Sequence, residues 1–156
     1  MMSTRCLSPA LAWLGALALC MAAPSAPASL GGNAASIASD STALGGTHTI
    51  ERAAGWEVHV LRLPFGVVVR EYLHGETVFA VAWSGRTLPN LRQLLGTYFE
   101  PYVESPRAHG AHHHRREVTT PDWVVQSVGH HGGFLGRAWL RNALPAGFDL
   151  ETLRAW

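Results

Sequence analysis

Histidines are the residues with the most obvious chemical capacity in this 156-residue chain. Neutral imidazoles are good ligands for zinc, copper or nickel. A structural zinc site normally closes four ligands into a tetrahedron at ordered spacing. Four histidines lie between residues 109 and 114, and three of these are consecutive and directly precede Arg115-Arg116. We therefore interpret the segment as an exposed loop that binds metal weakly and adventitiously, and we expect no resident cofactor. The metal candidates are His109, His112, His113 and His114.

A second histidine pair offers an enzymatic alternative. His130-His131-Gly132-Gly133 resembles a glycine-rich oxyanion loop, but the sequence has no G-x-S-x-G motif around a nucleophile. Ser84, His130 and Asp122 can be drawn as a triad, although nine histidines offer many such combinations. A small hydrolase or metal-dependent enzyme centred on His130 and His131 therefore remains the alternative, and a hairpin turn at Gly132-Gly133 is the simpler interpretation.

Charged residues inside apolar strand patterns are the remaining candidates. Arg70-Glu71 interrupts VVVREYL, and Arg137 interrupts FLGRAWL. Such residues could form a polar site on the outer face of a sheet, but exposed pairs across strands usually contribute less than about 1 kcal/mol. We predict no catalytic residue. The ligand-binding candidates are Arg70, Glu71, His130 and Arg137.

The first 28 residues read as a secretory signal peptide. Arg5 is followed by the uncharged apolar stretch LAWLGALALCMAA, and Ala26 and Ala28 place small residues where a signal peptidase reads the chain. The apolar stretch is shorter than the roughly 20 residues of a membrane span. We therefore expect cleavage after Ala28, a periplasmic or secreted location, and no membrane partner for the mature chain.

Composition limits what the remaining chain can do. Both cysteines, Cys6 and Cys20, lie in the predicted signal peptide, so the mature chain has neither a disulfide nor thiol chemistry. All twelve basic residues are arginine, and removing Arg5 leaves eleven against eleven acidic residues. This balance argues against nucleic-acid binding. The sequence identifies neither the ligand or protein partner nor the oligomeric state.

Strand patterns dominate the region from residue 47 onward. The block WEVHVLRLPFGVVVREYLHGETVFAVAW predicts three strands joined by turns at Pro64-Phe65-Gly66 and His74-Gly75-Glu76. A phase change near Val60 predicts a β-bulge there. In the third strand, Phe79, Val81 and Trp83 should share one face, opposite a face of small residues that a helix could approach. Residues 47–52 and 117–120 are candidates for short strands, and a hairpin across Gly132-Gly133 completes the sheet.

Two segments can form helices. Leu88, Leu91, Leu95, Tyr98 and Tyr102 recur at helical spacing, which predicts an amphipathic helix over residues 89–99 with Gly96 inside it. Residues 29–46 are small and polar, and either a linker or a short weak helix is consistent with them. Asp149 can cap a last helical turn containing Leu150 and Leu153.

The central and C-terminal motifs together are similar to those of a family of small secreted bacterial proteins classed as domain of unknown function 2844. The matching stretches are LGG at 44–46, LPFG at 63–66, VVREY at 68–72, VFAVAWSG at 78–85, LPNLRQLLG at 88–96, GH at 129–130, GRAWL at 136–140 and LPAG at 144–147. The resemblance implies an exported protein of one domain. It implies no activity, so it assigns no catalytic residue.

These patterns predict an α+β fold in which one main amphipathic helix packs on one face of an antiparallel sheet of about five to six strands. Residues 1–28 would be the signal peptide, 29–46 the linker or weak helix, and 47–156 a single domain. The expected function is that of an exported, non-enzymatic binding or accessory module. Its partner, an unknown protein or small molecule, would dock on the open sheet face or an exposed edge strand.

Overall fold

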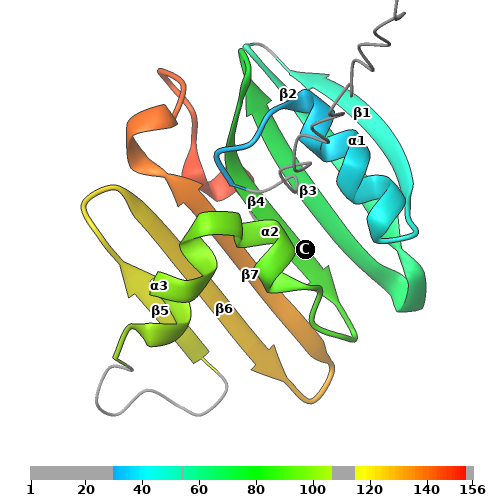
Figure 1. Ribbon diagram of the computed structural model, residues 1–156, viewed down its shortest axis with the longest axis vertical. Coiled ribbons are helices and arrows are strands. Elements are labelled where there is room, and N and C mark those ends of the chain that lie inside the picture. The colour runs from blue at the N-terminus through cyan, green and yellow to red at the C-terminus, as the bar shows by residue number, and fades with distance from the viewer. Residues whose placement is uncertain (1–29, 54, 107–114, 154–156) are drawn as a thin grey trace, which may run out of the picture.

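A seven-stranded sheet is the centre of the computed structural model, which describes residues 30–53, 55–106 and 115–153 (Figure 1). Every neighbouring pair is antiparallel, and the strand order is β1-β2-β3-β4-β7-β6-β5. The strands are β1 (Thr47–Ala53), β2 (Trp56–Leu63), β3 (Val67–His74), β4 (Thr77–Gly85), β5 (Arg115–Thr119), β6 (Trp123–His130) and β7 (Gly133–Leu140).

The antiparallel α+β architecture is confirmed, but the predicted number of strands was too low. The sheet has seven strands because both short edge segments, β1 and β5, pair along their whole lengths. The predicted hairpin across Gly132-Gly133 joins β6 and β7, with His130 opposite Gly133. Sequence patterning predicts short edge strands poorly, since their exposed side chains need not alternate.

Strand β4 lies in the middle of the sheet and is buried on both faces. Residues 78–83 are all completely buried. A β-bulge leaves Phe79 without a partner, because Tyr72 pairs with Ala80 while Leu73 pairs with Val78. Phe79 therefore lies on the same face as Ala80 rather than with Val81 and Trp83, so the predicted alternation was wrong.

The predicted bulge near Val60 is also wrong. Strand β2 pairs without interruption with both β1 and β3. Its apolar residues change sides because both faces of the strand are covered: Val58 and Val60 pack on one face, and Leu61 packs on the other. A strand with two buried faces loses the alternation expected of a half-exposed strand.

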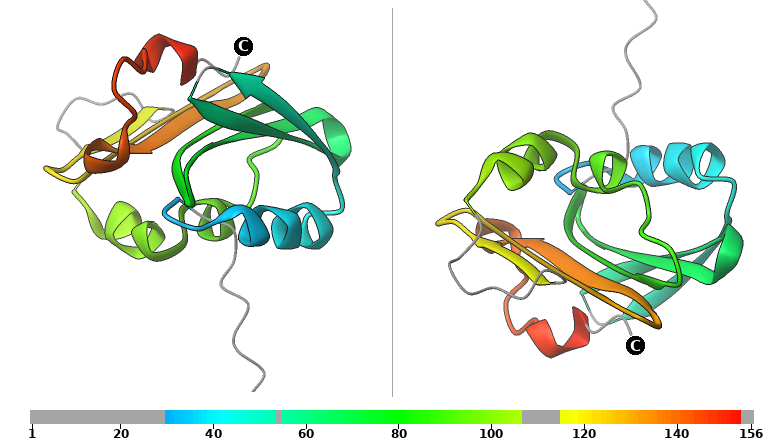
Figure 2. Two further views of the ribbon diagram at one scale, coloured as in Figure 1. Left: turned by 90° about the horizontal axis from the view of Figure 1, so that it is seen from above. Right: turned by 90° about the horizontal axis from the view of Figure 1, so that it is seen from below.

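Helices cover one face of the sheet (Figure 2). They are α1 (Ala34–Ala43), α2 (Leu91–Leu95) and α3 (Phe99–Glu104), with the 3-10 turn η2 (Gly96–Tyr98) between the last two. The predicted continuous helix 89–99 is thus broken, because Gly96 has φ +52° and ends α2. Leu91, Leu94 and Leu95 are buried as the stripe predicted, whereas Leu88 precedes the helix and is 45% exposed.

The C-terminal segment covers the opposite face. Its short turns are η3 (Arg141–Ala143) and η4 (Leu150–Leu153), and Glu151 N–H donates to the Asp149 carboxylate as the cap prediction required. Phe148 packs edge-on against Phe79 and Tyr72, with ring centroids 4.9 and 5.9 Å apart. The Tyr72 hydroxyl donates to the Thr152 carbonyl at 3.0 Å. The alanine face of β4 therefore meets this segment rather than a helix.

Polar groups are buried beneath α1. Asp40, His59 and Glu71 all lie inside, and Gln93 Nε2 donates to Asp40 Oδ1 at 2.6 Å. His59 Nδ1 lies 2.9 Å from His48 Nε2. Burial, assisted by the nearby His48, lowers the pKa of His59, against an opposing effect of Glu57. Burial, assisted by the Asp40 charge, raises the pKa of Glu71 to about 8, so this side chain is protonated at neutral pH.

Glu71 should make stability depend on pH. Its folded-state pKa lies above the unfolded value, so the native state keeps a proton that the unfolded chain releases between about pH 4.5 and pH 8. The free energy of unfolding should therefore fall as pH rises through this window, by up to about 1.4 kcal/mol per pH unit. Urea unfolding at pH 5, 6.5 and 8 should show a flatter profile for Glu71→Gln. Parallel profiles for the two proteins would contradict the assignment.

Gly136 leaves room for the buried indole of Trp83. A Cβ at this position would lie 2.1 Å from Trp83 Cζ2 and 2.8 Å from the Gln126 carbonyl oxygen. Gly136→Ala should therefore destabilise the fold by about 1–3 kcal/mol through overpacking, measured as a lower urea midpoint. Ser127→Ala, on the residue opposite Gly136 in the sheet, is the control and should change stability by less than about 0.5 kcal/mol.

Candidate functional site

Four arginines project from the sheet face that the helices leave uncovered. The register places Arg70 and Arg137 on either side of Ala82 in one row across the sheet. The next row has Arg62 near one edge and Arg115 near the other. Glu117 is the only acidic residue in these two rows. We call this surface, defined by Arg62, Arg70, Arg115 and Arg137, the arginine face.

Arg137 is the most firmly held of the four. Its Nε donates to Gln126 Oε1 at 2.7 Å, and its Nη1 donates to the Leu150 carbonyl at 3.1 Å. Its guanidinium also lies 5.5 Å from the ring centroid of Trp139. Strand β7 supplies the backbone, β6 the amide and the C-terminal segment the carbonyl. A guanidinium has five N–H groups, so several remain for another acceptor.

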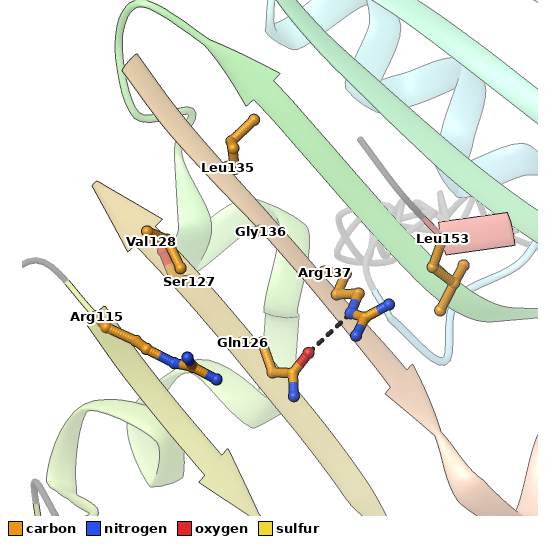
Figure 3. Close-up of a pocket in the computed structure, with 8 residues that line it drawn as sticks. All are labelled: Arg115, Gln126, Ser127, Val128, Leu135, Gly136, Arg137 and Leu153. Atoms are coloured by element: carbon orange, nitrogen blue, oxygen red, sulfur yellow. Dashed lines mark hydrogen bonds between the residues drawn. The ribbon is translucent and has the colours of Figure 1, made fainter. Parts of the chain in front are cut away.

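A pocket of about 230 Å³ lies beside this side chain (Figure 3). Gln126 and Arg137 point toward each other at one end, and Arg115 extends from β5 toward them. Val128, Leu135 and Leu153 supply apolar surface, while the backbones of β6 and β7 form the floor at Ser127 and Gly136. The pocket therefore combines cationic groups with an apolar wall.

The electrostatics of the arginine face favour an anion. The Glu117 carboxylate already has two partners: its Oε1 accepts a hydrogen bond from Gln126 Nε2 at 3.1 Å, and its Oε2 accepts one from Arg115 Nη2 at 3.1 Å. The Gln126 hydrogen bond, followed by Arg115, lowers the pKa of Glu117, which stays ionised at neutral pH. Arg70 is half-buried and has no hydrogen bond or ion pair among the residues that the structure describes. The positive charge of this face thus exceeds its negative charge.

The four ligand-binding residues predicted from the sequence do not form a single site. Arg70 and Arg137 share the arginine face, whereas Glu71 lies on the opposite face beneath α1. His130 ends β6, and its side chain lies outside what the structure describes. The segment of His109, His112, His113 and His114 is likewise outside the described residues. Among the residues that are described, no three His, Cys, Asp or Glu side chains could hold a metal ion.

The structure does not assemble the Ser84–His130–Asp122 triad. Ser84 is near the end of β4, opposite Leu135 at the start of β7. Asp122 precedes β6 at the other end of the sheet, where its carboxylate accepts from Asn142 Nδ2. Five residues of strand separate these ends, or roughly 16 Å. A serine and an aspartate so far apart cannot orient one histidine between them.

Sequence reasoning missed Arg115, Gln126 and Leu153 as pocket residues. Gln126 and Arg137 are polar positions in neighbouring strands that pair directly, and this signal was available once the β6–β7 hairpin had been predicted. The positions of Arg115 and Leu153 depend on long-range contacts of β5 and η4, which no local pattern records.

Comparison with known proteins identifies a family without a described activity. No curated protein and no solved structure matches the chain. None of the helices that the structure describes is long and apolar enough to cross a membrane. A family described as protein of unknown function (DUF2844) matches residues 26–153, which include every described residue of the arginine face and its pocket. The chain belongs to this family.

Proposed function

We propose that this protein is an exported, non-enzymatic binding module, periplasmic or secreted, that holds a carboxylate-bearing ligand in the Arg137 pocket. The observation that carries the proposal is the pocket itself, where a fixed guanidinium adjoins apolar side chains. A planar guanidinium fork pairs well with a carboxylate, and the pairing is stronger where neighbouring groups hold the fork in place.

Pocket size limits the ligand. About 230 Å³ is below the 300–1,000 Å³ of pockets that enclose drug-sized molecules. The ligand is therefore a small aliphatic acid, or the carboxylate end of a longer chain that continues across the open sheet. Val128, Leu135 and Leu153 contact its apolar part, and Arg137 binds its carboxylate.

The export half of the proposal is supported by the charge and size pattern of residues 1–28. The full chain, produced in a Gram-negative host, should yield a periplasmic product that begins at Ser29, as measured by intact mass. Ala28→Arg should block this cleavage, since signal peptidase reads a small residue there. Pro27→Ser, at the unread position between Ala26 and Ala28, is the matched control and should be processed normally. A cytoplasmic, unprocessed product would contradict export.

Binding can be tested with hexanoate, with hexanol as the uncharged comparison. Calorimetry should detect hexanoate but not hexanol, because the alcohol has no charge for the guanidinium. Arg137→Gln should raise Kd roughly ten- to hundredfold, the effect of losing one charge-assisted hydrogen-bonded pair. Arg92→Gln, on α2 at the opposite face, should leave Kd unchanged.

A second pair of variants tests the charge of the pocket without disturbing Arg137. Val128 is 37% exposed at the pocket wall, so a polar side chain there should not disrupt the core. Val128→Glu places a carboxylate next to the ligand and should abolish hexanoate binding, whereas the similarly shaped Val128→Gln should retain most of it. Equal affinities for the two variants would refute anion recognition at this pocket.

A further inference from the structure

The hairpin loop between β2 and β3 presents an aromatic residue in an unfavourable backbone conformation. Phe65 has φ +60°, followed by Gly66 at φ +74°, and its side chain is 83% exposed. Consecutive positive φ angles in hairpin turns are normally supplied by Asn-Gly or Gly-Gly, because a Cβ strains this conformation. Phe65 is the one non-glycine residue with positive φ in the described chain. Glycine would therefore be more stable at this position, and the exposed Phe65 ring makes no core contact that could offset the backbone strain.

The surroundings of Phe65 are basic and partly apolar. The end of β4 lies beside the start of β3, since a Cβ on Gly85 would meet Val67 Cα at 2.7 Å. The β2–β3 loop, the exit from β4 and the β6–β7 turn consequently lie at one end of the sheet, at the lower right of Figure 1. Leu88, 45% exposed, follows β4 there, and Arg62 and Arg86 flank the two loops.

The described loops at this end carry no negative charge that would offset these cations. The loops 44–46, 64–66, 86–90 and 131–132 contain no Asp or Glu. Arg62 and Arg86 are exposed and have no hydrogen bond or ion pair within the parts of the chain that the structure covers. An aromatic tip between unpaired arginines is complementary to a surface that is apolar inside and anionic outside, as an anionic lipid bilayer is.

We propose that this end of the sheet docks on an anionic lipid surface, with Phe65 inserted below the headgroups and Arg62 and Arg86 bound to lipid phosphates. A bilayer accepts one protruding aromatic ring without needing a matching pocket, whereas a protein partner would need one. The contact is peripheral and reversible, because it uses one ring, one leucine and two charges. It contradicts the sequence-based expectation that the mature chain has no membrane partner, and it does not involve the Arg137 pocket.

Co-sedimentation of the mature chain with vesicles tests this proposal. We expect binding to vesicles of phosphatidylglycerol mixed with phosphatidylcholine, and much weaker binding to pure phosphatidylcholine. The partition coefficient on anionic vesicles should fall as salt rises. Phe65→Gly should reduce it at least about tenfold, since the inserted ring is lost. Phe65→Trp should retain it, and Arg62→Gln with Arg86→Gln should reduce it, while Arg92→Gln should not.

Phe65→Gly also separates a docking role from a structural one. Glycine relieves the strain at φ +60°, although its greater freedom in the unfolded chain offsets part of that gain. The thermal midpoint should therefore stay the same or rise while vesicle binding is lost, and hexanoate binding should not change. Vesicle binding that is absent in the wild type, or unaffected by Phe65→Gly, would overturn the proposal. Self-association that Phe65→Gly abolishes, without vesicle binding, would overturn it in favour of a second copy of the chain.

Discussion

The burial of β4 on both faces is the constraint on which this structure depends. Residues 78–83 expose no surface, so the fold needs two separate covers. The helices pack over Val81 and Trp83, and the C-terminal segment packs over Phe79, Ala80 and Ala82. The bulge at Phe79 matters here because it places a large ring on the alanine face, where Phe148 packs edge-on against it.

The second cover also creates the pocket. The aromatic contacts of Tyr72, Phe79 and Phe148 fix the C-terminal segment over the central strands. That placement brings the Leu150 carbonyl to Arg137 and Leu153 to the pocket wall. The segment does not extend over Val128, so the outer part of the face stays open. The same segment thus contributes to the core and to one wall of the pocket.

Sequence patterns predicted the architecture better than its details. Hairpin turns and β-rich stretches identified the antiparallel sheet, because turn chemistry and alternation are local properties. The bulge was misplaced, since a doubly buried strand such as β2 shows the same loss of alternation as a bulged one. The predicted helix 89–99 is too long because Gly96, which the apolar pattern places in its interior, has a positive φ that ends α2.

Sequence patterns identified only some of the residues of the candidate site. Arg70 and Arg137 stand out as charges within apolar strands, and both project from the open face. Glu71 stands out equally, yet its neighbours on the strand place it inside, where Asp40 and burial keep it protonated. A one-residue step along a strand reverses the face, so the sequence could not say which charge is inside without knowing that both faces are covered.

The two covers of β4 are synthesised at different times, because every covering helix precedes residue 105 whereas the C-terminal segment follows the last strand. Until residues 143–153 leave the ribosome, the nascent chain still exposes the face formed by Phe79, Ala80 and Ala82. Native packing over this face therefore waits for residues 143–153 to be synthesised.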